Sequence, residues 1–143
     1  MKILPILKDC VAAAMKVSKL SWDVVDGNLL ITPDGFVLYK LPAADVPISF
    51  AKKKRTKSVA LVWDKAAAAE DYQDVTRMYM VPAKKKPKRN LMILNDDVAI
   101  DTRLMKHFDP GAKLQCKRPI DPVRVYEDGQ MVGIILPVRR ELA

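Results

Sequence analysis

The stretch at residues 20–42, "LSWDVVDGNLLITPDGFVLYKLP", decides the fold class of this chain. Two turn signals divide it, "DG" at Asp26 and "PDG" at Pro33. Short apolar segments separated by such turns are typical of antiparallel strands joined by hairpins. We therefore predict strands here, with a core that includes Trp22, Val24, Leu30, Phe36 and Leu38.

A helix is predicted on the N-terminal side of these strands, over residues 5–19. Pro5 suits the first helical position, because its ring fixes a helical backbone angle where the N–H would have no partner. Leu7, Val11 and Ala14 recur at helical spacing and would form an apolar stripe facing the sheet. The other side of this helix would carry Lys8, Lys16 and Lys19.

The C-terminal part of the chain predicts the same order of elements. Asp101 is a good N-cap for a short helix over residues 102–108, with Leu104, Met105 and Phe108 toward the core. Three strand candidates follow, "KLQCK", "PVRVYED" and "MVGIILPV", and the turn "EDGQ" joins the last two as a hairpin. Each end thus predicts a helix followed by antiparallel strands.

The middle of the chain has two further strand candidates, "SVALVWD" at residues 58–64 and "VTRMYMVP" at residues 75–82. An antiparallel pair would place Val59, Leu61, Trp63, Met78 and Met80 on one face. Together these patterns predict a single α+β domain over residues 1–143. It would have antiparallel sheets, two short helices and two similar helix-plus-strands halves.

The formal net charge is +8, and two short runs account for it, "AKKKRTK" at residues 51–57 and "AKKKPKR" at residues 83–89. The predicted strand pair would bring the two runs together as one basic patch. Like charges repel, so such a patch favours a polyanion as partner. Solvated loops and nuclear-import signals remain alternatives. The run cations are Lys52, Lys53, Lys54, Arg55, Lys57, Lys84, Lys85, Lys86, Lys88 and Arg89.

Signs of catalysis or cofactor binding are weak in this sequence. The chain has only five glycines, and none forms a dinucleotide- or phosphate-binding loop. His107 is the single histidine, and we interpret it as a helix-surface residue rather than a catalytic one. Cys10 and Cys116 lack ligand spacing and are expected to be reduced core thiols. We therefore expect no enzyme activity, no cofactor and no metal.

The two ends of the chain resemble one domain of the bacterial DNA polymerase sliding clamps. The ending "IDPVRVYEDGQMVGIILPVRR" is similar to the clamp hairpin that closes in a proline-hydrophobe-arginine signature, and residues 22–41 are similar to the clamp's opening strands. The resemblance implies two helices packed on curved antiparallel sheets. It also implies that helix cations face duplex DNA, here Lys8, Lys16, Lys19, Arg103 and Lys106.

The resemblance further implies a groove for partner peptides near Leu136, Pro137, Val138 and Arg139. A bacterial clamp subunit has three such domains, so a ring built from this chain would need several copies. A homo-oligomer and peptide partners are therefore expected beside nucleic acid. The two lysine runs match no clamp motif and would add contacts of their own.

The function expected from these observations is non-enzymatic binding of nucleic acid, DNA first, without sequence preference. Lysine-rich runs contact phosphates and carry no information about base edges. A clamp-like accessory factor in DNA replication or mobile-element maintenance fits both the charge and the resemblance. The alternatives are a small RNA- or DNA-coating protein and a protein-interaction adaptor. We expect no membrane partner and a cytoplasmic protein, at the nucleoid if bacterial, because the N-terminus lacks a long apolar run.

Overall fold

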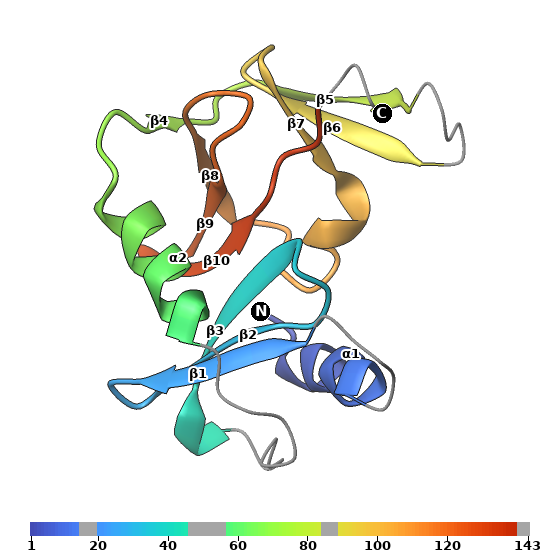
Figure 1. Cartoon of the computed structure of the whole chain (residues 1–143). Coiled ribbons are helices and arrows are strands. Elements are labelled where there is room, and N and C mark those ends of the chain that lie inside the picture. Colours follow the sequence, from blue (N-terminus) through green and yellow to red (C-terminus); the bar gives the residue numbers. More distant parts are fainter. Residues whose placement is uncertain (15–19, 46–56, 84–88, 140–143) are drawn as a thin grey trace.

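Two antiparallel sheets form the framework of the computed structural model, which describes residues 1–14, 20–45, 57–83 and 89–139 (Figure 1). One sheet has seven strands in the order β1-β2-β3-β10-β9-β8-β4, and the other has the order β5-β6-β7. The predicted α+β class with antiparallel sheets is confirmed. The elements are α1 (Ile3–Ala14), β1 (Ser21–Val25), β2 (Asn28–Thr32), β3 (Val37–Pro42), η1 (Ala43–Asp45), α2 (Lys57–Ala68), β4 (Gln73–Asp74), β5 (Met78–Pro82), β6 (Asn90–Leu94), β7 (Val98–Asp101), η2 (Thr102–Met105), β8 (Lys113–Cys116), β9 (Val123–Glu127) and β10 (Gln130–Ile135).

The seven-stranded sheet contains two similar halves that meet at its centre. There, β3 pairs antiparallel with β10, with Val37 opposite Ile135 and Tyr39 opposite Gly133. The meander β1-β2-β3 lies on one side of this pair and β10-β9-β8 on the other. A helical segment precedes each meander, α1 in the first half and η2 in the second. The strand order is therefore mirrored about the central pair, with β4 added at the β8 edge.

Hairpin turns predicted from the sequence hold the meanders together. Asp26 and Gly27 connect β1 to β2 with positive φ angles of 50° and 75°. Asp128 and Gly129 connect β9 to β10 with φ angles of 52° and 76°. Two consecutive residues of positive φ match the right-handed twist of the flanking strands, and Asp-Gly tolerates this conformation well.

The largest hydrophobic core lies on the face of the seven-stranded sheet that α1 covers. Ile6, Leu7 and Cys10 of α1 are at most 1% exposed, and they pack with Tyr39 of β3 and with Phe108 after η2. The spacing of these three helix residues explains why a short apolar helix is stable here, since burial of its apolar face supplies most of the stabilisation. The three-stranded sheet contributes Leu94, Val98 and Ile100 to the same core.

The opposite face carries α2, where the sequence predicted a strand, and that prediction is wrong. Val59, Trp63 and Ala66 of α2 are buried, and their spacing of four and three residues is helical. The alanines that follow Lys65 extend the helix, because alanine has the highest helix propensity. Their partners on the sheet are Leu30, Leu38 and Ile134.

The strand predicted at residues 75–82 is present as β5, but its partner is β6, with Met78 opposite Leu94. Its outer edge pairs with no other described strand. Several residues predicted for the core are exposed instead, because they lie on edge strands, in a turn or on the outer side of α2. These are Val24, Phe36, Leu61, Met78 and Met80.

Candidate nucleic-acid interface

Only part of the predicted DNA-contacting set falls on residues that the structure describes. Lys8 lies on α1, Arg103 on η2, Lys106 just after η2, and Arg89 just before β6. Lys57 is the first residue of α2. The remaining predicted cations lie outside the described residues: Lys16, Lys19, Lys52, Lys53, Lys54, Arg55, Lys84, Lys85, Lys86 and Lys88.

The strand pair that was to bring the two lysine runs together does not exist. The last residue of the first run, Lys57, starts α2, which contacts β1 and packs on the seven-stranded sheet. The second run lies between β5 and β6, and its described neighbours are side by side, with the Ala83 N–H donating to the Arg89 carbonyl over 2.9 Å. α2, which begins at Lys57, and β6, which follows Arg89, lie in different parts of the molecule (Figure 1). The original reason to expect one merged patch is therefore lost.

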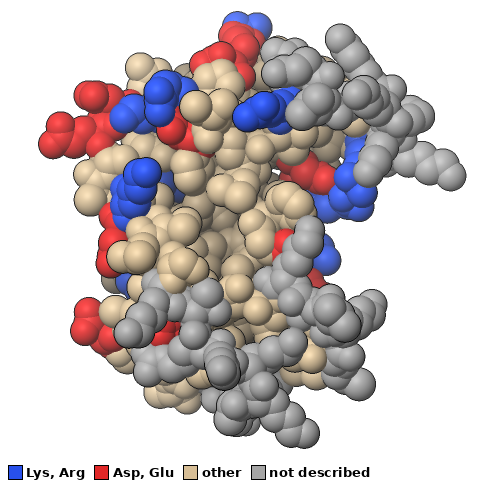
Figure 2. Space-filling model, in the orientation of Figure 1, with Lys and Arg blue, Asp and Glu red and all other residues tan. Residues whose placement is uncertain are grey.

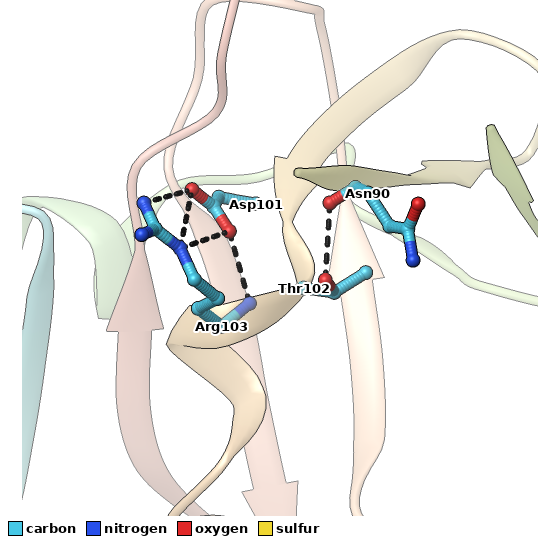
Figure 3. A network of polar contacts seen from close by, with 4 residues as sticks. All are labelled: Asn90, Asp101, Thr102 and Arg103. Carbon is cyan, nitrogen blue, oxygen red and sulfur yellow. Dashed lines mark hydrogen bonds and ion pairs between the residues drawn. The ribbon is translucent and has the colours of Figure 1, made fainter. Parts of the chain in front are cut away.

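Asp101 organises the second of the predicted helix sites. The sequence predicted it as an N-cap, and its Oδ1 accepts the backbone N–H of Arg103 over 3.0 Å. The Arg103 guanidinium also donates to both carboxylate oxygens, with Nη2 lying 2.9 Å from Oδ2 (Figure 3). Thr102 Oγ1 donates to the Asn90 carbonyl over 3.0 Å, which ties η2 to the first residue of β6. The predicted helix over residues 102–108 is thus shorter, a 3₁₀ turn that ends at Met105.

Arg89 reaches the same carboxylate electrostatically. Burial by itself would raise the pKa of Asp101, but hydrogen bonds from Arg103 and the positive charges of Arg103 and Arg89 outweigh it and lower that pKa. Asp101 therefore stays ionised between two arginines from separate segments. Arg89 from the second lysine run and Arg103 from η2 therefore both favour the negative charge on Asp101.

Asp9 on α1 plays a similar part for Lys106. Asp9 Oδ2 lies 3.2 Å from Lys106 Nζ and 2.7 Å from His107 Nε2. An ionised carboxylate only accepts hydrogen bonds, so Nε2 is the donor in the second contact. Burial would raise the pKa of Asp9, but the hydrogen bonds from His107 and Lys106 lower it overall. These contacts join α1 directly to the segment after η2.

His107 differs from its prediction as a surface residue. It is only 7% exposed, and its ring lies 6.2 Å from that of Tyr39. The turn after η2 points the imidazole inward, where Asp9 satisfies it. Its position explains why a short 3₁₀ segment can replace the longer helix that the sequence predicted.

A polar pocket of about 250 Å³ opens between α1, η2 and the turn before β3. Both Arg103 and Lys106 line it, together with Asp9, Asp34 and the buried Tyr39. The side chains of Arg103 and Lys106 are 59% and 58% exposed, so an outside group can reach both. The pocket therefore combines two accessible cations, of which Lys106 contacts Asp9 in the lining and Arg103 contacts Asp101 beside it.

The described surface shows a mixture of charges. On the face drawn in Figure 2, lysine and arginine side chains lie among aspartate and glutamate rather than in one continuous basic field. Concentrated positive charge in the sequence comes mainly from the two runs, most of whose residues are outside the described ranges.

The predicted peptide groove divides into two environments. Leu136, 37% exposed, lines an apolar pocket of about 270 Å³ between α2 and the central strands. The exposed side chains Phe36 and Val62 line the same pocket. Val138 packs instead against the three-stranded sheet, where its N–H donates to the Ala99 carbonyl over 2.7 Å. Pro137 is half-buried and Arg139 is exposed.

Sequence reasoning missed the carboxylates of this site. Asp101 was predicted as a cap but not as an arginine partner, and Asp9 was not predicted at all. Their partners depend on tertiary contacts, since Asp9 meets His107 from the other end of the chain. The pairing of Asp101 with Arg103 could have been expected from their spacing, because an N-cap Asp and a cation two residues later lie on the same turn.

Metal centres and membrane-spanning helices are two other kinds of feature that the described ranges could contain. No group of three or more His, Cys, Asp or Glu side chains is arranged to hold a metal ion there. Among the described helices, none has the length and apolar character that a transmembrane span needs. Comparisons with protein-family models, curated proteins and solved structures gave no match.

Proposed function

We propose that this protein binds nucleic acid without sequence preference and without catalysis, as a clamp-like accessory factor in DNA replication or mobile-element maintenance. The observation that carries this proposal is the gathering of cations from three segments around Asp9 and Asp101. Arg103 and Lys106 line one pocket, and Arg89 contributes to the field at Asp101. Lys8 precedes Asp9 on the exposed side of α1.

The arrangement of the helical segments supports the clamp-like part of the proposal. The clamp resemblance implies two helices on one side of curved sheets, with cations turned toward the duplex. Here α1 and η2 precede the two meanders, and residues from both pack into the same core on one face of the seven-stranded sheet. Cations carried on these segments therefore share one side of the molecule.

The binding mode that these groups support is contact with phosphates. Lysine and arginine supply charge and hydrogen-bond donors, and counterion release makes such binding sensitive to salt. Four phosphate contacts would give a slope of about −3 to −4 in a plot of log K against log salt concentration. The two lysine runs are proposed to steepen this slope further. The protein would then act in the cytoplasm, at the nucleoid if bacterial.

A protein-interaction adaptor is the second candidate, and the apolar pocket beside α2 favours it. Phe36, Val62 and Leu136 are large apolar side chains that stay accessible around this pocket. A peptide with an apolar anchor would bury them, as in helix- or strand-in-groove recognition. The two candidates are compatible, since a clamp-like factor is expected to hold both nucleic acid and a peptide partner.

The test is a titration of labelled 20-base-pair DNA, followed by fluorescence anisotropy at several salt concentrations. One variant replaces Lys8, Arg89, Arg103 and Lys106 with glutamine. Its control carries the same number of glutamines at exposed cations elsewhere: Lys65, Arg77, Lys113 and Arg118. We expect the first variant to bind at least tenfold more weakly than the control, with a shallower salt slope.

A second variant tests the lysine runs separately, with all ten run cations replaced by glutamine. We expect non-specific DNA binding to be abolished while the circular dichroism spectrum is unchanged. The proposal is wrong if the wild-type protein does not bind DNA at low salt. It is also wrong if neither variant binds more weakly than the control.

A further inference from the structure

Both accessible cations of the polar pocket are already held by carboxylates, but the two carboxylates are held differently. Asp101 is 12% exposed, caps η2 and contacts Arg103 through both oxygens, so it is fixed by the fold. Asp9 is 40% exposed and contacts Lys106 through a single oxygen over 3.2 Å. An exposed ion pair of this kind is weak, and an outside anion can replace it.

Asp9 has a second partner that keeps it in place. His107 Nε2 lies 2.7 Å from the same Oδ2 atom, and the imidazole is 9% exposed. If Lys106 turned toward a phosphate, Asp9 would still accept the hydrogen bond from His107. The exchange therefore needs only the Lys106 side chain to move, while α1 and the turn after η2 stay joined.

We propose that Asp9 is an internal competitor for phosphate, which occupies Lys106 in the unbound protein and yields it when nucleic acid binds. This inference rests on the proposed function and concerns the regulation of the same site. Competition of this kind lowers affinity and the salt slope together, because the phosphate at Lys106 releases a cation from the nucleic acid while the freed Asp9 carboxylate attracts one from solution. It limits how long the protein stays at one place on a nucleic acid, since weaker phosphate contacts shorten residence.

Lys106 and Lys8 are expected to contribute differently to DNA binding. Lys8 is exposed and makes no ion pair with a described residue, so it is ready to contact phosphate. Lys106 must first give up Asp9. Neutralising Lys8 should therefore weaken DNA binding more than neutralising Lys106.

The experiment is a double-mutant cycle on DNA affinity, measured by anisotropy over a range of salt concentrations. Asp9→Asn removes the competing charge but keeps the side-chain shape. We expect it to tighten binding about three- to tenfold and to steepen the log–log salt slope by up to about one. The same substitution in a Lys106→Gln background should give no more than a twofold change. Asp64→Asn on the exposed side of α2 is the matched control for net charge, and it should change affinity less than twofold.

The possible results test the proposed function and the competitor role of Asp9 separately. If wild type and all variants fail to bind DNA at low salt, the proposed function is wrong. If they bind but Asp9→Asn gains no more than Asp64→Asn, the competitor role is overturned. An equal gain with and without Lys106 overturns it as well. Should Asp9→Asn fail to fold by circular dichroism, Lys8→Gln and Lys106→Gln decide: an equal or larger loss for Lys106→Gln contradicts the inference.

Discussion

Arg124 on β9 offers a sharp test of how α2 is held on the sheet. Its side chain is 9% exposed and turns toward α2. Nη1 donates to the carbonyls of Ala66, Ala67 and Ala69, at 3.1, 3.2 and 3.3 Å. A helix leaves its last four carbonyls without internal partners, and a cation at this end also complements the helix dipole. Arg124 therefore acts as a cap supplied by a distant strand.

We expect Arg124→Met to lower the free energy of unfolding by about 2–4 kcal/mol. A hydrogen bond to a charged group contributes about 1.5–3 kcal/mol, and Nη1 has two protons to share among three carbonyls. The guanidinium carbon also lies 3.8 Å from the centre of the Tyr72 ring, a contact of about 1–2 kcal/mol when shielded from water. The cost of burying the cation offsets part of this sum.

The assay is urea unfolding followed by far-ultraviolet circular dichroism, together with a thermal melt. The expected loss corresponds to a fall in melting temperature of about 6–16 °C for a chain of this size. Hydrogen exchange should show the largest increase in the amides of α2. Arg118→Met is the matched control, because Arg118 is exposed and its ion-pair partner among the described residues is Asp121, three residues later. A loss below about 0.5 kcal/mol for Arg124→Met would mean that α2 stays docked without this cap.

Three further predictions concern the core, the pH dependence and the apolar pocket. Gly133→Ala should lower stability by about 1–3 kcal/mol in urea unfolding, because the added Cβ would clash with the buried ring of Phe108. Burial alone would raise the pKa of Asp9, but hydrogen bonds from His107 and Lys106 lower it overall. The stabilisation that Asp9 provides is therefore fully present at neutral pH and is lost as pH falls through its lowered folded pKa. Acid unfolding of Asp9→Asn should lack that component. Leu136→Asp should shift the melting temperature by only a few degrees, since the side chain is 37% exposed; a cooperative collapse would place Leu136 in the core.

Hairpins were the most predictable part of the fold, because their signal is local. Asp-Gly at Asp26 and at Asp128 specifies a tight turn wherever the rest of the chain lies. The cap at Asp101 was predictable for the same reason. Each of these features depends on a few adjacent residues and their backbone angles.

The sequence predicted a strand where α2 lies, because the apolar residues there fit both the period of a strand and that of a helix. Val59, Leu61 and Trp63 alternate as in a strand, while Val59, Trp63 and Ala66 fit a helix. The buried set follows the helical period, and Leu61 is 69% exposed. The alanine-rich segment after Lys65 continues the helix to Ala68. Length and propensity together would have favoured the helix.

The candidate site was predictable in its cations but not in its geometry. Lys8, Arg103 and Lys106 were chosen from helical spacing and from the clamp resemblance. Their pairing with carboxylates depends on how α1 and η2 meet, which no local pattern encodes. The lysine runs show the same limit, because the reason to expect them together was one strand pair, and the fold has α2 in place of its first strand.

The central pairing of β3 with β10 sets an order for events during synthesis. Val37 leaves the ribosome long before its partner Ile135. Until then one edge of β3 has no partner strand, and α1 has only the first meander of the sheet to pack against. Partner strands so distant along the chain also slow folding, because the connecting loop must close first. A chaperone that shields this edge during translation would therefore raise the yield of native protein, and a stalled ribosome would release a species prone to aggregation.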